Sequence, residues 1–164
     1  MFFVFRNHPH TSEATPFLLL SEISASGGPV KLLEAGSRVT ENEIATAIVD
    51  AAVEVHRTLG GPGLLESVYE QALAEELRLR GLTVERQREV PVQYKGRELG
   101  TGFRVDLIVE RRVIVECKAV DQYNDLFEAQ LLTYLRLLNL KLGLVINFGD
   151  KLVKRGIRRV VNGL

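Results

Sequence analysis

The feature that most constrains the fold of this chain is a pair of apolar segments at residues 105–109 and 113–115, separated by the charged triplet at 110–112. Two apolar runs on either side of a short polar break are typical of a β-hairpin. If the triplet forms the loop, residues equally far from it lie opposite each other and share a face of the sheet. The segment therefore predicts two paired strands of an apolar sheet.

Three charged residues interrupt this apolar hairpin. Asp106 lies in the first strand, and Glu116 and Lys118 end the second. Asp106 is then opposite Glu116, and Lys118 shares the face of Glu116 because side chains alternate along a strand, whereas Cys117 points to the other face. Acidic side chains in apolar strands are costly unless their charge is compensated, and a bound metal ion is the usual compensation.

Two other patterns lie on either side of the hairpin, GLLESVY at residues 63–69 and QLLTY at residues 130–134. The strand pattern Asp-x9-Glu-x-Lys resembles the core of the PD-(D/E)XK nuclease superfamily. GLLESVY resembles the motif that names its GxxExxY family, and QLLTY resembles the QxxxY pattern of exonuclease-type members. The resemblance covers residues 40–161, and it is specific because all three patterns occur in the expected order.

The resemblance implies a fold of the α/β class, a restriction-endonuclease-like αβββαβ core in which helices lie against a mixed sheet. It also implies a metal-dependent nuclease that hydrolyses phosphodiester bonds, with DNA favoured over RNA as substrate. Asp106, Glu116, Lys118 and Glu66 are the expected catalytic residues. The three carboxylates and the backbone carbonyl of Cys117 would hold Mg²⁺ or Mn²⁺, which prefer oxygen ligands, and Lys118 would position the attacking water and stabilise negative charge.

Substrate contacts are expected from Gln130, Tyr134, Tyr69 and Arg104. Gln130 and Tyr134 are four residues apart, so they share one face of a helix. Tyr69 follows Glu66 by three residues, and two interpretations stay open for it. Its hydroxyl group bonds the Glu66 carboxylate, or its ring packs in the core.

The charge distribution bears on how the chain would bind nucleic acid. The formal net charge is zero and the pI is about 6.8, which excludes a surface that is strongly basic overall. Any binding of nucleic acid must therefore rely on local basic patches. Residues 151–164 contain no acidic residue. The basic residues expected to follow phosphate groups are Arg78, Arg80, Arg86, Arg88, Arg104, Lys151, Lys154, Arg155, Arg158 and Arg159.

Length and composition narrow the class of protein. The chain has 164 residues, which corresponds to one domain with a substantial core. Its single cysteine excludes an intrachain disulfide and favours a reducing compartment, so a cytoplasmic location is expected. No apolar run approaches the roughly 20 residues that span a bilayer, so no membrane partner is expected.

The first 38 residues differ from the rest of the sequence. They read as loop, and we expect a disordered arm or a non-native extension upstream of a natural start at Val39. Thr40 and Glu43 then form the pattern of a capping box, which marks a helix start. The nuclease-like domain is therefore expected at residues 39–164.

Periodicity and turn residues give the order of elements in this domain. The expected elements are a helix at 41–57, a helix at 64–80 stopped by Gly81, a strand at 83–94 bent at Pro91, the hairpin at 103–119, a helix marked by leucines between 126 and 138, a strand at 142–148 and an edge strand within 151–161. The second helix is expected to turn Leu65, Val68, Ala72 and Leu77 inward.

Some residues and one alternative function lie outside the nuclease interpretation. Cys117 is expected to be a buried core residue and not a nucleophile, and His56 is expected to pack. Asp121 and Glu128 are expected to be surface charges. The rival function is a non-catalytic nucleic-acid-binding or regulatory module that keeps the nuclease fold and uses the basic tail.

Overall fold

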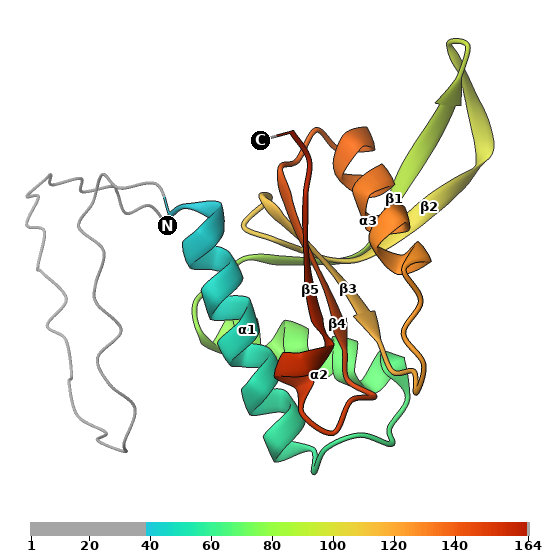
Figure 1. Ribbon diagram of the computed structural model, residues 1–164. Coiled ribbons are helices and arrows are strands. Elements are labelled where there is room, and N and C mark those ends of the chain that lie inside the picture. Colours follow the sequence, from blue (N-terminus) through green and yellow to red (C-terminus); the bar gives the residue numbers. More distant parts are fainter. Residues whose placement is uncertain (1–38, 164) are drawn as a thin grey trace, which may run out of the picture. The chain divides into compact units, whose positions relative to one another are not determined.

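A pair of helices precedes the first strand, and a third helix separates the later strands (Figure 1). The computed structural model describes residues 39–163, so the predictions for residues 1–38 lie outside it. The elements are α1 (Glu41–Thr58), α2 (Glu66–Leu79), β1 (Val84–Tyr94), β2 (Arg97–Val109), β3 (Val113–Lys118), α3 (Leu126–Leu137), β4 (Leu142–Asn147), the 3-10 turn η1 (Val153–Gly156) and β5 (Ile157–Val161).

The strands form one mixed sheet in the order β1-β2-β3-β4-β5. Neighbouring strands are antiparallel except β3 and β4, which are parallel and are joined by a crossover through α3. The predicted class and the restriction-endonuclease-like arrangement of a mixed sheet with helices against it are confirmed. No helix within residues 39–163 is long and apolar enough to cross a membrane.

The two faces of the sheet carry separate hydrophobic cores. Val113, Val115 and Cys117 point to the face covered by α1 and α2. Ile114 points to the opposite face, which α3 covers. All residues of β4 are buried, as expected for a strand covered on both sides. By alternation, Glu116 shares the α3 face with Ile114.

The central hairpin has the predicted register. Leu107, Ile108 and Val109 pair with Val115, Ile114 and Val113, and residues 110–112 form the loop. Strand β2 begins at Arg97, earlier than predicted, and extends with β1 into a long ribbon that projects from the sheet (Figure 1). The register of this ribbon shifts beside Pro91, as the predicted bend requires.

The predicted inward face of α2 is wrong at Leu65 and Val68 and correct at Leu77 and at Ala72, which is partly buried against the core. Leu65 precedes the helix and is 74% exposed, and Val68 is 39% exposed. Tyr69 and Leu73 are buried instead, together with the predicted Leu77. These three residues recur every four positions, so burial of the large Tyr69 ring sets the rotation of the helix.

The ends of α1 and α2 follow the predicted signals. The Thr40 hydroxyl accepts from Glu43 N, and the Glu43 carboxylate accepts from Thr40 N at 2.7 Å. Gly81 has a φ of +82° after α2, and Leu82 N donates to Leu77 O, which is a common glycine stop. The predicted edge strand is shorter than expected, because residues 153–156 form η1 before β5 begins.

Candidate active site

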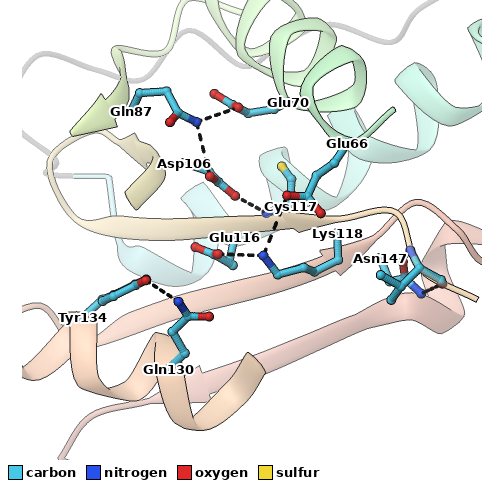
Figure 2. Close-up of polar contacts among 11 residues, drawn as sticks. Glu66, Glu70, Gln87, Asp106, Glu116, Cys117, Lys118, Gln130, Tyr134 and Asn147 are labelled. Carbon is cyan, nitrogen blue, oxygen red and sulfur yellow. Dashed lines mark hydrogen bonds and ion pairs between the residues drawn. The ribbon is translucent and has the colours of Figure 1, made fainter. Parts of the chain in front are cut away.

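The site lies at the carboxyl end of β3, where β2 and the start of α2 meet that strand (Figure 2). It brings together Asp106 from β2, Glu116 and Lys118 from β3, and Glu66 from the first turn of α2. Lys118 Nζ lies 2.8 Å from Glu116 Oε1 and 3.9 Å from Glu66 Oε1. All four residues predicted to be catalytic therefore belong to one cluster.

Asp106 occupies the point where the hairpin ladder ends. It is in register with Glu116, but the last backbone pair is Leu107 with Val115. Beyond this pair, Asp106 Oδ2 accepts a hydrogen bond from Cys117 N at 2.9 Å. The side chain thus satisfies a backbone donor that a continuing strand would otherwise have paired.

Gln87 and Glu70 also belong to the site, although the sequence did not predict them. Gln87 lies in β1 with a φ of +51°, and its Nε2 donates to Glu70 Oε2 at 2.7 Å and to Asp106 Oδ1 at 3.3 Å. Glu70 is 5% exposed and pairs with Arg86 at 3.1 Å. Its position four residues after Glu66, on the same helix face, was the available signal.

Glu116 has the most perturbed carboxylate of the cluster. Its residue is 4% exposed, and its Oε2 has no hydrogen-bond partner within residues 39–163. Burial, followed by the charge of Asp106, raises the pKa of Glu116 to about 7. Burial also raises the pKa of Asp106, although the bond from Cys117 N opposes the shift.

Lys118 remains a cation in this environment. Burial lowers the pKa of its ammonium group, but the hydrogen bond and charge of Glu116, with the charges of Glu66 and Asp106, outweigh burial and raise the pKa overall. One ammonium therefore faces three carboxylates, and negative charge is in excess.

The donor set fits a divalent cation. A buried carboxylate oxygen without a partner, next to a second carboxylate, is what a bound cation would neutralise, and oxygen is the ligand that Mg²⁺ prefers. Residues 39–163 contain no cluster of three or more His, Cys, Asp or Glu side chains already arranged to hold a metal ion. The fit therefore rests on the chemistry of Glu116 and Asp106.

The interpretations of Cys117 and His56 are confirmed. The Cys117 thiol is fully buried in the core under α1 and α2, and burial raises its pKa well above the usual value. His56 is 8% exposed, its Nε2 lies 3.0 Å from Asp150 O, and its ring stacks on Phe148. Neither side chain is placed to act as a nucleophile or base.

Tyr69 packs in the core and does not bond Glu66. Its hydroxyl group donates to Gly61 O at 2.7 Å and accepts from Leu64 N at 3.2 Å. Its ring is fully buried and stacks on Phe148 at 4.7 Å. The expected direct contact between Tyr69 and substrate is therefore wrong: the residue fastens the turn that leads into α2.

Gln130 and Tyr134 form a pair on α3. Gln130 Nε2 donates to the Tyr134 hydroxyl group at 2.5 Å (Figure 2). Tyr134 is 2% exposed, and burial, then the charge of Glu116, raises its pKa. Gln130 is only partly buried and is the more accessible member of the pair.

Five of the arginines predicted to follow phosphate groups already have acidic partners. The pairs are Arg78 with Glu75, Arg80 with Glu76, Arg86 with Glu70, Arg88 with Glu85 and Arg104 with Glu89. Arg104 is 61% exposed and 3.6 Å from its partner, so its ion pair is weak and open to exchange. Lys151, Lys154 and Arg155 are exposed and form no ion pair within the described part of the chain.

Comparison with known proteins identifies the family. A family model for the PD-(D/E)XK nuclease superfamily matches residues 42–160. No curated protein and no solved structure matched the chain. The matched range covers most of the chain and includes every residue of the cluster described above. The chain belongs to the PD-(D/E)XK nuclease superfamily.

Proposed function

We propose that the protein is a metal-dependent nuclease of the GxxExxY branch and that it hydrolyses phosphodiester bonds in DNA. The observation that carries the proposal is the Glu116 carboxylate, which is buried beside Asp106 and Lys118 with one oxygen unpartnered among the described residues. A buried carboxylate oxygen without a partner destabilises the fold unless a bound cation or ligand compensates it. Carboxylates with perturbed pKa values of this kind concentrate at functional sites. Family membership supports the same reaction class.

The cation-binding residues in this proposal are Asp106, Glu116 and Glu66, with the backbone carbonyl of Cys117. A bound Mg²⁺ or Mn²⁺ would lower the pKa of the attacking water and neutralise negative charge on the phosphate. Glu116 is partly protonated near pH 7 in the metal-free protein, so it releases a proton when it becomes a ligand. Cation affinity is therefore expected to rise with pH.

Lys118 has a different task. A charged ammonium has three donors and no acceptor, so it cannot ligate a cation. The bond to Glu116 Oε1 holds Nζ in place at 2.8 Å, and its remaining donors are available to a phosphate oxygen. As a preorganised cation it stabilises the negative charge that develops during hydrolysis.

The test uses supercoiled DNA, linear DNA and single-stranded RNA, each with Mg²⁺, Mn²⁺ or EDTA. We expect wild-type protein to cleave DNA only with metal. Lys118→Met should abolish cleavage yet keep Mn²⁺ binding in calorimetry. Lys95→Met, which removes an exposed lysine at the tip of the β1–β2 ribbon, is the matched control and should cleave as wild type.

Three results would contradict parts of this proposal. Folded wild-type protein that cleaves no substrate with either metal would favour the non-catalytic binding module. Loss of Mn²⁺ binding in Lys118→Met would contradict the division of tasks between the lysine and the carboxylates. Cleavage of RNA and not of DNA would change the substrate while leaving the reaction class in place.

A further inference from the structure

An aromatic pair adjoins the ammonium group of the site. Lys118 Nζ lies 5.3 Å from the centre of the Phe127 ring. The Tyr123 ring meets Phe127 edge to face, with 5.5 Å between the centres and 86° between the planes. Tyr123 lies in the loop after β3, and Phe127 lies in the first turn of α3. Both residues therefore belong to the segment that follows the end of β3 at the site.

A second cation lies beyond the pair. The guanidinium carbon of Arg158, in β5, is 5.1 Å from the centre of the Tyr123 ring. Arg158 Nη1 donates to the carbonyl oxygens of Arg155 and Ile157 at 2.6 and 3.1 Å, which fixes the side chain. The result is a row of cation, ring, ring and cation that starts at Lys118.

Core contacts leave both aromatic residues partly exposed. Tyr123 and Phe127 are partly buried and pack against the core under α3. The Tyr123 hydroxyl group donates to Glu128 Oε1 at 3.3 Å. Core packing accounts for the buried parts of the two residues, but it does not require cations at both ends of the row.

We propose that Tyr123 and Phe127 form a stacking subsite for an unpaired nucleobase next to the cleaved phosphate, and that Arg158 contacts a neighbouring phosphate. The inference rests on the proposed function for the choice of a nucleic acid ligand. Nucleobases stack on aromatic side chains with little sequence preference, and a spaced cation suits the backbone that joins them. A base inside a duplex has both faces covered by its neighbours, so the subsite accepts single strands, overhangs or frayed ends.

The test measures binding without catalysis. A single-stranded oligodeoxynucleotide that contains 2-aminopurine is titrated with protein in EDTA, and anisotropy gives the affinity while 2-aminopurine quenching reports stacking. Tyr123→Leu and Phe127→Leu should each bind at least about fivefold more weakly and lose quenching, because base–aromatic stacking is of that size. Tyr123→Phe, which keeps the ring, should bind and quench as wild type.

A matched control comes from the ribbon. Tyr94 is also an exposed tyrosine with a lysine, Lys95, over its ring at 5.5 Å. Because Tyr94 is at the ribbon tip and outside the proposed subsite, Tyr94→Leu should leave affinity and quenching unchanged. Equal losses in Tyr94→Leu and Tyr123→Leu would show general aromatic adhesion and overturn the subsite.

Arg158→Gln tests the phosphate contact separately and alters only an exposed side chain. For single strands, the slope of log affinity against log salt should fall by about 0.7, the value for one lost phosphate contact. An unchanged slope, or Leu variants that bind and quench as wild type, would overturn the proposal. If the protein quenches 2-aminopurine but cleaves nothing with Mn²⁺, the subsite stands and the proposed nuclease activity is wrong. If the protein cleaves DNA but its quenching does not depend on the two rings, the nuclease activity stands and the subsite is wrong.

Discussion

At the scale of single residues, Glu116 couples the stability of the protein to pH. Its pKa is raised from 4.5 to about 7 in the folded chain, so the folded state holds a proton that the unfolded state has released between these values. The free energy of unfolding should therefore fall as pH rises through this window, by no more than about 3 kcal/mol. Glu116→Gln should lack this fall. Urea unfolding in EDTA at several pH values measures the difference, and parallel curves for the two proteins would contradict it.

Asp106 gives the second prediction at this scale. Mg²⁺ at about ten times its dissociation constant should stabilise wild type by about 1.4 kcal/mol. Asp106→Asn should melt at the wild-type temperature or above it in EDTA, because it relieves repulsion with Glu116 while its side-chain oxygen can still accept from Cys117 N. It should gain little from Mg²⁺ or Mn²⁺.

The control for Asp106→Asn is Asp121→Asn, which alters an exposed carboxylate in the loop after β3. This variant should respond to metal as wild type does. A severe loss of stability in Asp106→Asn without metal, together with a wild type indifferent to metal, would make Asp106 a structural partner only. The proposal would then lose its main support.

Three of the four central residues could be grouped from the sequence because their spacing is local, whereas Glu66 was predicted from the resemblance of GLLESVY to a family motif. Asp106, Glu116 and Lys118 lie on one hairpin, where loop length and strand alternation determine which side chains meet. Glu70 and Gln87 escaped prediction because their contact depends on how α2 packs on β1, and a strand residue with positive φ has no sequence signature unless it is glycine.

At the scale of elements, the turn before α2 is the part that Tyr69 holds in place. Tyr69→Phe leaves Gly61 O and Leu64 N without this partner. Unfolding should become easier by about 1–3 kcal/mol, the usual cost of groups that lose a buried partner. Cleavage should fall as well, because Glu66 follows this turn directly.

Tyr94→Phe is the control for this change, since the Tyr94 side chain is 61% exposed. It should alter neither the urea midpoint nor cleavage. If Tyr69→Phe were as stable as Tyr94→Phe, the hydroxyl group would not hold the turn. If it were destabilised but fully active, the turn would not control Glu66.

Element types were predictable where the pattern was strongly periodic or strongly apolar, as in α1, β3 and β4. The rotation of α2 was not predicted correctly, because this helix has two candidate apolar faces. Leu65 and Val68 define one, while Tyr69 and Leu73 define the other. The choice between them is made by the stacking of Tyr69 on Phe148, which is 79 positions later in the chain.

At the scale of the whole molecule, we predict that residues 39–164 fold without the preceding segment. Val39 packs against the core under α1 and α2. Arg112 donates to Val39 O and pairs with Glu41 at 3.1 Å. A chain in which Val39 follows only an initiator methionine should melt within a few degrees of the full chain. Insolubility or a larger fall would mean that residues 1–38 contribute to folding.

The matched control is a chain that begins at Asn42. It lacks Val39, the Thr40 cap and the Glu41 partner of Arg112. Loss of the cap alone is expected to cost about 1 kcal/mol. This shorter chain should therefore melt clearly below the chain that begins at Val39.

The overall topology was predicted from the resemblance to the nuclease superfamily, and the order of helices and strands agrees with it. The electrostatic surface was not, since the acidic partners of the arginines come from neighbouring turns and strands. Arg104, for example, meets Glu89 only through the pairing of β2 with β1. A count of basic residues along the chain therefore overstated the positive charge available to phosphate groups.

The buried Cys117 thiol makes the protein its own reporter. It is the single cysteine of the chain, and it lies between Glu116 and Lys118 with its sulfur sealed under the helices. A thiol reagent can reach it only when the packing of α1 and α2 on β3 opens, so the labelling rate in the native protein reports the free energy of that opening. A ligand that clamps the neighbouring carboxylates or the lysine will slow labelling, and occupancy can be followed in unmodified protein without any catalytic turnover.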